Sequence, residues 1–382
     1  MTLPDLTLTG ARVLTPGGLA DTPLSLAGGR IAPASDGPRV DLSGHLILPG
    51  IVDIHGDGFE RHLAPRRGAL ESLSAGLSSF DAELAANGIT TAVIAQFFSW
   101  EGGMRGPDFA EALVDALSET PMLADTMIQL RLEIGMIDDF DRALALVARG
   151  GVRYVVLNDH LPHKELAAGK RPPSLTGQAL KARRSPEAHR AMLQEMHDRW
   201  AAVPGALSRL CSALTERGVL IGSHDDHTTA DRMRGRALGA TVCEFPETRE
   251  AATAAHVAGE GVIMGAPNLV RGRSHAGKVA ASDLVAEGLV DALASDYHYP
   301  SPARAAFRLV SEGMDLGRAW ALISEGPARL LGLTHRGQLA PGFRADIVIV
   351  EEESHRITGT LADGTVSYLA GPLAARFLEA AA

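Results

Sequence analysis

The amino-acid sequence predicts an α/β fold, a (β/α)8 TIM-like barrel with a small β-sandwich domain, and three observations support it. Eight apolar runs of strand length alternate with alanine-rich helical stretches across the middle of the chain. Short strand-like segments, punctuated by Gly, Pro and Asp, occupy both ends of the chain. Carboxylates and imidazoles follow nearly every apolar run, as expected where barrel strands end.

The eight runs are mostly apolar throughout rather than alternating, which is typical of parallel strands buried on both faces. An open doubly wound sheet is the alternative, but it explains the terminal β segments less well. The predicted strands are Ile47–Ile54, Thr90–Ala95, Met127–Ile134, Val152–Leu157, Val219–Ser223, Ala240–Phe245, Gly261–Gly265 and Asp291–Ser295.

The two ends of the chain share one texture, so we expect residues 1–47 and 337–382 to form the small β domain together. The barrel, residues 48–336, would be inserted between them. One connection, residues 158–218, is too long for a minimal barrel and carries several lysines and arginines. Long connections of this kind are often binding loops, and a solvated, partly helical excursion is the alternative.

Composition narrows the class of partner. The net charge of −10 over 382 residues argues against a nucleic-acid partner, so an anionic small-molecule substrate would need a local basic patch or metal ions. The two cysteines, Cys211 and Cys243, are too few for a disulfide framework. No secretory leader and no apolar run of membrane-spanning length is present, so we expect a cytoplasmic protein with no membrane partner. Homo-oligomerisation is left open.

The segment 48–57 ends an apolar run in a His-x-Asp pair, His55 and Asp57. Because side chains alternate along a strand, these two point to the same face. An imidazole and a carboxylate side by side at the end of a barrel strand are typical metal ligands. By itself the pair is a weak signal, since His-x-Asp is short.

Later predicted strands strengthen the pattern because they end in the same residue types. An acidic residue in the apolar third run would be costly to bury without a cation, although pairing with an arginine is the alternative. The strand-end candidates after His55 and Asp57 are Glu133, His160, His224, Glu244 and Asp296.

The segment that follows the seventh predicted strand, residues 265–278, is an anion-binding candidate. In this segment Asn268 follows Gly-Ala-Pro, and the basic residues Arg271, Arg273, His275 and Lys278 lie among small residues. Arginine offers a fork of donors to phosphate oxygens, glycine allows close backbone approach, and loops after late barrel strands often hold phosphate. A solvated basic turn is the alternative.

At this point the pattern resembles the amidohydrolase superfamily over nearly the whole chain. The His-x-Asp pair after Leu-Pro-Gly, the histidine of the fifth strand, the aspartate of the eighth strand and the closing Pro-Gly-x-x-Ala-Asp segment all fit it. The runs Ser-His-Asp-Asp (223–226) and Gly-Ala-Pro-Asn (265–268) are more specific. Gly56 and Gly58 depart from the family, which more often has larger polar residues there.

The resemblance implies a metal-dependent hydrolase with one or two divalent ions, for which we expect zinc. It implies cleavage of a phosphoanhydride in a ribose phosphonate triphosphate, with release of pyrophosphate. Asp296 would be the catalytic general base as well as a metal ligand. The implied metal ligands are His55, Asp57, Glu133, His224 and Asp296, with His160 and Glu244 as further candidates. The implied substrate-binding residues are Asn268, Arg271, His275, Lys278, Asp225 and His62.

Two alternatives stay open. One is a hydrolase with the same metal site that acts on a cyclic amide or an N-acyl group, although the basic residues after the seventh strand favour phosphate. The other is a non-catalytic binding homologue, against which the near-complete ligand set argues. No Gly-x-Ser-x-Gly elbow, phosphate-binding loop or dinucleotide fingerprint is present.

Overall fold

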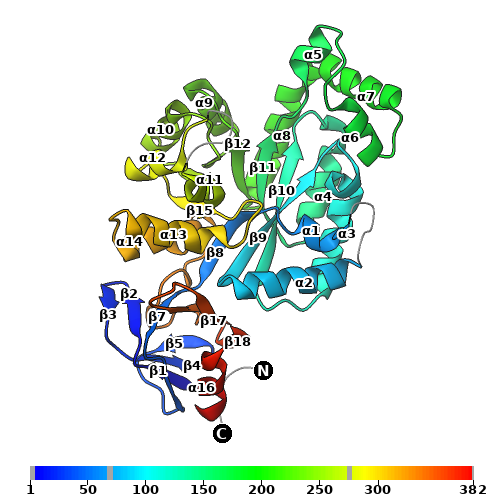
Figure 1. Cartoon of the computed structure of the whole chain (residues 1–382). Helices are drawn as coiled ribbons and strands as arrows, with labels where there is room; N and C mark the ends of the chain where they lie inside the picture. Colours follow the sequence, from blue (N-terminus) through cyan, green and yellow to red (C-terminus); the bar gives the residue numbers. More distant parts are fainter. Residues whose placement is uncertain (1–4, 67–71, 273–277, 381–382) are drawn as a thin grey trace. The chain divides into compact units, whose positions relative to one another are not determined.

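The computed structural model describes residues 5–66, 72–272 and 278–380. Eight strands form one sheet in the order β15-β14-β13-β12-β11-β10-β9-β8, which confirms the predicted barrel (Figure 1). A parallel bridge joins Gly56 to Asp296, so the first and last strands meet. The strands are β8 (Ile51–Gly56), β9 (Ile89–Phe98), β10 (Asp125–Glu133), β11 (Val152–Asn158), β12 (Leu220–His224), β13 (Val242–Glu244), β14 (Gly261–Gly265) and β15 (Ala292–Ala294).

Several predicted strands differ by a few residues in their bounds, and the first predicted strand combines two observed ones. The run Ile47–Ile54 is two strands, because β7 (His45–Pro49) ends before β8 begins. β7 pairs with the C-terminal strand β16 (Ile347–Glu351), so the chain passes from one sheet to the next at Gly50. A Cβ atom on Gly50 would lie 2.2 Å from Thr90 Oγ1, and this close approach explains why a glycine marks the change of sheet.

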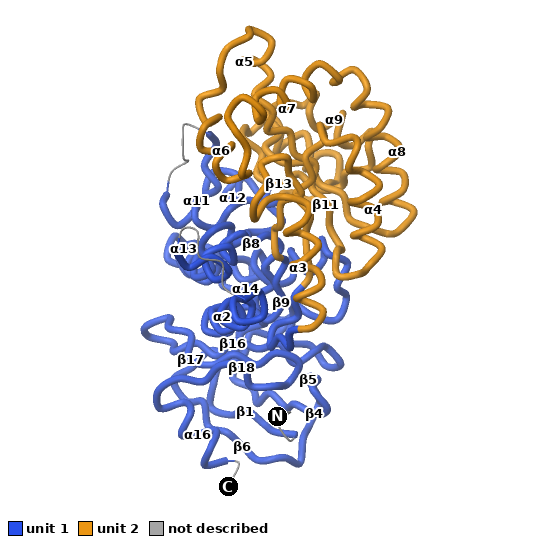
Figure 2. Tube along the Cα trace, turned by 90° about the vertical axis from the view of Figure 1, so that its right-hand side faces the viewer, with its two compact units in different colours: residues 1–93, 120–126, 263–382 blue, residues 94–119, 127–262 orange. Residues whose placement is uncertain are grey.

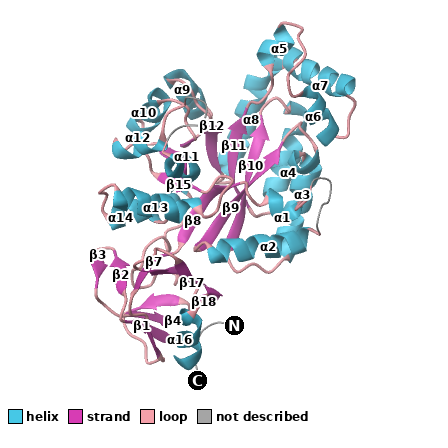
Figure 3. Cartoon of the chain, viewed as in Figure 1, coloured by secondary structure: helices cyan, strands magenta, loops and turns pink. Residues whose placement is uncertain are grey.

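Helices connect the barrel strands (Figure 3). In the amphipathic helix α4 the buried residues are Phe140, Ala143, Leu146 and Val147, spaced as one helical stripe. The helices of this region are α1 (Glu60–Leu63), α2 (Leu73–Ala86), α3 (Pro107–Glu119), α4 (Phe140–Ala148), α8 (Val203–Glu216), α9 (Thr229–Ala237), α10 (Arg249–Val257), α11 (Ala266–Arg271), α12 (Ala281–Ala286), α13 (Ser301–Ser311), α14 (Leu316–Ala321) and α15 (Glu325–Leu330).

The ends of the chain form two further sheets, as the sequence predicts; N-terminal strands make up the first, and both ends contribute to the second. A four-stranded sheet has the order β5-β4-β1-β6, and a six-stranded sheet has the order β18-β17-β16-β7-β2-β3. One apolar cluster, which includes Leu8, Val40, Ile347 and Leu361, contains residues of both sheets. The remaining elements are β1 (Leu6–Thr9), β2 (Arg12–Thr15), β3 (Gly18–Ala20), β4 (Leu24–Ala27), β5 (Arg30–Ala32), β6 (Arg39–Asp41), β17 (Ile357–Ala362), β18 (Thr365–Leu369) and α16 (Pro372–Ala380).

The long connection predicted at residues 158–218 is helical. It forms α5 (His163–Ala167), α6 (Leu175–Lys181) and α7 (Pro186–Asp198) before α8. These helices share a small apolar cluster of their own, made of Trp100, Leu161, Leu166, Leu175 and Leu193. The connection is therefore a packed excursion and not an irregular loop.

The chain divides into two compact units, coloured separately in Figure 2. Unit 1 comprises residues 1–93, 120–126 and 263–382, and unit 2 comprises residues 94–119 and 127–262. The predicted domains, residues 1–47 with 337–382 and residues 48–336, divide the chain differently and stay a prediction. Among the described residues, no helix has both the length and the apolar character needed to cross a membrane.

Candidate metal centre

The first predicted ligand pair lies where β8 ends, in unit 1. Every residue of β8 is buried, and the His55 imidazole has no exposed surface. Asp57 follows directly after the strand and is partly exposed. A buried strand that ends in an imidazole followed by a solvent-reaching carboxylate can offer both groups to a ligand at its mouth.

The end of β15 supplies Asp296, also in unit 1. Its backbone is left-handed, with a φ of 55°, a conformation that is uncommon outside glycine but better tolerated by Asp and Asn. Two hydrogen bonds fix it: the Asp296 amide donates to the His55 carbonyl at 2.9 Å, and its carbonyl accepts from the Asp57 amide at 2.9 Å. The backbone thus ties Asp296 to both members of the first pair.

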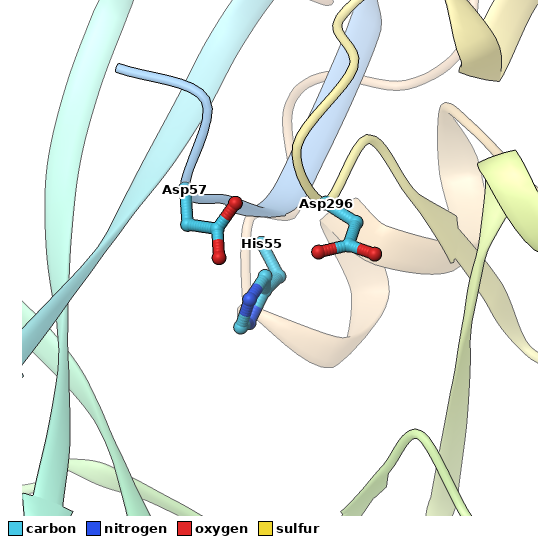
Figure 4. A group of neighbouring side chains, drawn as sticks. All are labelled: His55, Asp57 and Asp296. Atoms are coloured by element: carbon cyan, nitrogen blue, oxygen red, sulfur yellow. The ribbon is translucent and has the colours of Figure 1, made fainter. Parts of the chain in front are cut away.

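These three side chains form one cluster. One potential ligand atom from each of His55, Asp57 and Asp296 lies within 4.8 Å of the other two, and Figure 4 shows the side chains converging. Two carboxylates this close repel each other unless a cation lies between them. One imidazole and two carboxylates are also a donor set that divalent ions such as zinc accept. The residues therefore fit a divalent ion.

In unit 2, the predicted ligands Glu133 and His160 form a pair. Glu133 is fully buried, accepts a hydrogen bond from the Trp100 indole at 3.2 Å and contacts the His160 imidazole at Nδ1. Burial opposes the charged imidazole, but the hydrogen bond and charge of Glu133 outweigh it and raise the pKa of His160. Glu133 therefore contacts a histidine in these hydrogen bonds, and not an arginine as in the alternative from the sequence.

His224 and Glu244 form a second pair in unit 2. His224 Nδ1 lies 2.9 Å from Glu244 Oε2, and Arg131 Nη2 lies 3.0 Å from His224 Nε2. Since a guanidinium only donates, His224 Nε2 accepts and Nδ1 donates to Glu244. Burial, followed by the charge of Arg131, lowers the pKa of His224, so the ring is neutral near pH 7.

Sequence reasoning missed Arg131. Its guanidinium is buried and stacks over the Phe97 ring, with the guanidinium carbon 4.1 Å from the ring centroid. The signal was available, because Gln129, Arg131 and Glu133 occupy alternate positions of β10 and therefore share one face. Gln129 also contacts the same network, donating to Glu244 at 2.9 Å.

The predicted substrate-binding residues lie in different surroundings. Asn268 accepts a hydrogen bond from the Ala281 amide at 3.1 Å, which is a local structural contact. Arg271 is exposed at the end of α11, with its guanidinium carbon 5.5 Å from the centre of the Tyr297 ring. His62 contacts Glu83 on α2.

The other three predicted substrate residues complete the set. Lys278 is exposed, and Asp225 has a left-handed backbone with a φ of 58° while its amide donates to the Glu244 carbonyl at 3.0 Å. His275, like Arg273 of the same segment, lies outside the described residues. The structure thus brings together three of the predicted ligands, His55, Asp57 and Asp296, whereas the described substrate residues lie in separate surroundings.

Comparison with known proteins identifies the protein family. Residues 62–368 match the model of the Amidohydrolase family, which is more than half of the chain. The chain therefore belongs to the amidohydrolase family. The matched region begins after His55 and Asp57, so the evidence for these two ligands is their geometry.

One curated relative is more specific. The chain is 33% identical over 345 residues to the alpha-D-ribose 1-methylphosphonate 5-triphosphate diphosphatase of Escherichia coli (strain K12). This alignment covers 83% of the chain and 86% of that protein.

Solved structures support the fold. A Xaa-Pro dipeptidase with bound methionine has a TM-score of 0.64 at 13% identity, covering 95% of this chain and 99% of that one. The N-acetylglucosamine-6-phosphate deacetylase of Pasteurella multocida has a TM-score of 0.63 at 12% identity, covering 95% of this chain and 100% of that one. At such low identity the likeness establishes the fold alone.

Proposed function

We propose that this chain is a metal-dependent hydrolase that cleaves a phosphoanhydride of a ribose phosphonate triphosphate and releases pyrophosphate. The observation that carries the metal dependence is the cluster of His55, Asp57 and Asp296, in which two carboxylates meet one buried imidazole. The similarity to the E. coli diphosphatase supports the substrate class.

His55, Asp57 and Asp296 would hold the divalent ion, for which we propose zinc. Such an ion supplies a Lewis acid that lowers the pKa of water toward about 7. The His55 imidazole is buried at the end of the strand, and a neutral imidazole is the form that donates a lone pair to a metal.

Asp296 would also act as the general base. Its carboxylate is partly exposed and its backbone is fixed by hydrogen bonds to His55 and Asp57, so it can reach a water molecule without rearrangement. The carboxylate accepts a proton from water while the water oxygen forms a bond to the α-phosphorus. The anhydride bond to the β-phosphate breaks, and pyrophosphate leaves with the bonding electron pair.

Basic side chains would offset the charge that develops on the phosphoryl oxygens. We propose this role for the exposed Arg271 and Lys278, together with His275. Asn268, Asp225 and His62 stay predicted substrate residues. Four unit 2 residues stay predicted metal ligands: Glu133, His160, His224 and Glu244. If they also bind metal, the protein holds two ions; if they do not, it holds one.

The test combines metal analysis with a substrate panel. Protein purified without chelator is assayed for bound metal, and then for pyrophosphate and phosphate release from ribose 1-methylphosphonate 5-triphosphate and nucleoside triphosphates. Hydantoins and N-acyl amino acids complete the panel. We expect one or two metal equivalents and pyrophosphate release that stops after chelation. Turnover of an amide without any pyrophosphate release would contradict the proposed reaction.

A further inference from the structure

A buried carboxylate lies two residues before the first proposed ligand. Asp53 belongs to β8, is 1% exposed, and would be costly to bury without hydrogen-bond donors. Ser295 supplies both donors, because its amide donates to Asp53 Oδ1 at 2.8 Å and its hydroxyl donates to Asp53 Oδ2 at 2.5 Å. We call this pair the Asp53–Ser295 latch. These two hydrogen bonds fix the backbone at Ser295, the residue immediately before Asp296.

The latch acts on a strained residue. Asp296 holds a φ of 55°, which L residues rarely adopt, and such a conformation persists only when the surroundings impose it. Hydrogen bonds to His55 and Asp57 fix Asp296 on one side, and the latch fixes Ser295 on the other. The backbone at the end of β15 therefore has little freedom to relax.

The close packing around Gly56 also restricts the backbone next to the proposed ligands. A Cβ atom on Gly56, which lies between His55 and Asp57, would come within 2.7 Å of Asp53 Oδ2 and 3.0 Å of Ser295 Oγ. The same atom would lie 2.7 Å from Cε1 of the buried Tyr299. The latch thus packs directly against the segment that carries two proposed ligands, which explains why this position is a glycine.

We infer that Asp53 is a positioning residue for the metal centre. Through Ser295 it holds Asp296 in the left-handed conformation that brings its carboxylate to His55 and Asp57. Asp53 is not assigned as a ligand, because both of its oxygens accept hydrogen bonds from Ser295. This inference rests on the proposed function, since it concerns the same centre.

The test compares variants that break the latch with one that keeps it. D53A removes both acceptors, and S295A removes the hydroxyl donor alone. D53N is the conservative variant, because its amide oxygen can accept from the Ser295 amide while the serine hydroxyl turns to accept from the side-chain N–H. The matched control is D81A, since Asp81 is also a buried unit 1 carboxylate and accepts the Leu123 and Ala124 amides at 2.7 and 3.0 Å.

Three quantities are measured for each purified variant: Zn²⁺ affinity by competition with a chromophoric chelator, melting temperature, and kcat and KM separately for pyrophosphate release. Loss of a partner that orients metal ligands costs roughly 10- to 100-fold in affinity or activity. We expect D53A to lose Zn²⁺ affinity and kcat in that range with KM little changed. S295A should lose less Zn²⁺ affinity and less kcat than D53A, and D53N should retain most of the wild-type value of both. D81A lowers the melting temperature alone.

The inference is overturned if D53A and S295A lower the melting temperature as D81A does but keep the wild-type Zn²⁺ affinity and kcat. If D53A fails to fold, S295A and D53N are compared instead: lower Zn²⁺ affinity and kcat in S295A than in D53N support the inference, and wild-type values in both variants overturn it. Zn²⁺ binding by the wild type without pyrophosphate release would contradict the proposed reaction, and the affinity readout would still test the latch. A wild-type protein that binds no Zn²⁺ overturns both proposals.

Discussion

The two units arrange the acidic residues of the predicted ligand set differently. In unit 2 each buried glutamate of the predicted ligand set contacts its own histidine, Glu133 with His160 and Glu244 with His224. In unit 1 two aspartates, Asp57 and Asp296, gather around the single imidazole of His55. The predicted ligand set thus pairs one acid with one histidine in unit 2 and places two acids beside one histidine in unit 1.

This difference indicates where a cation is needed. In unit 1 the two carboxylates and the imidazole offer ligand atoms within 4.8 Å of one another, and like charges this close favour the binding of a cation. In unit 2 each glutamate instead contacts a histidine of its own, and this contact offsets part of the cost of burying the carboxylate. A cluster in which acids outnumber histidines is therefore stronger evidence for a metal ion than the same residue types in pairs.

The largest expected effect comes from the D296N variant. Asparagine tolerates the left-handed backbone at this position, so we expect the fold and melting temperature to be retained. The general base is lost together with one negative charge of the cluster, and such a loss costs roughly 10²- to 10⁴-fold in rate. Steady-state kinetics of pyrophosphate release measure it. Unchanged turnover would remove Asp296 from the proposed mechanism.

The free energy of unfolding of the metal-free protein tests the difference between the two units. E244A leaves the buried donors of His224 and Gln129 without their acceptor, at a cost of about 1–3 kcal/mol for each unsatisfied group. D57A instead removes one of two neighbouring carboxylates, so we expect a smaller loss in the free energy of unfolding than in E244A. Denaturant unfolding in the presence of chelator measures both.

The control for this pair is the metal-loaded protein. With Zn²⁺ present, D57A should lose the stabilisation that ligand binding gives the wild type, which is about 2.7 kcal/mol at a hundredfold excess over Kd. Destabilisation by D57A in the metal-free protein, to the same extent as by E244A, would show that the two regions do not differ.

The fold was largely predictable, and the reason is periodicity. Continuous apolar runs identified all eight barrel strands, because parallel strands are buried on both faces. The boundary between β7 and β8 was not predictable, since Ile47 and Ile51 are equally apolar while belonging to different sheets. Only the close packing around Gly50 separates them.

The unit 1 centre was predictable for a similar reason. His55, Asp57 and Asp296 stand at strand ends, where a barrel gathers side chains from distant parts of the sequence. Arg131 was missed because its neighbours His224 and Phe97 come from other strands, far from it in the sequence. The contact of His62 with Glu83 is likewise set by helix packing, which sequence spacing does not reveal.

Arg271 tests the proposed substrate charge with a smaller effect. The residue is exposed and lies outside the metal cluster, so R271A should leave metal content and melting temperature unchanged. Loss of a charge-assisted contact to phosphate costs about 1.5–3 kcal/mol, or roughly 10- to 100-fold in kcat/KM. R271K is the control that keeps the charge. Equal kcat/KM in R271A and the wild type would exclude Arg271 from the substrate site.

The smallest expected effect is a pH dependence in unit 2. His189 is fully buried, and burial, followed by the charge of Arg184, lowers its pKa below the ordinary value of 6.5. The unfolded chain therefore binds a proton more readily, so stability falls as the pH drops through about 6.5 toward the folded pKa. Melting temperatures from pH 8 to about pH 5 should fall less in H189L than in the wild type. Parallel curves would contradict this assignment.

The most direct test of the central claim is the metal content of the folded protein, measured by elemental analysis for the wild type and for a variant carrying H55A, D57A and D296N. The proposed function predicts one or two equivalents of a divalent ion in the wild type, and the comparison of units predicts that the variant loses at least one of them. Circular dichroism confirms that both proteins are folded. A folded wild-type protein that takes up no divalent ion, even when Zn²⁺ is supplied, would contradict the assignment of the cluster as a metal centre.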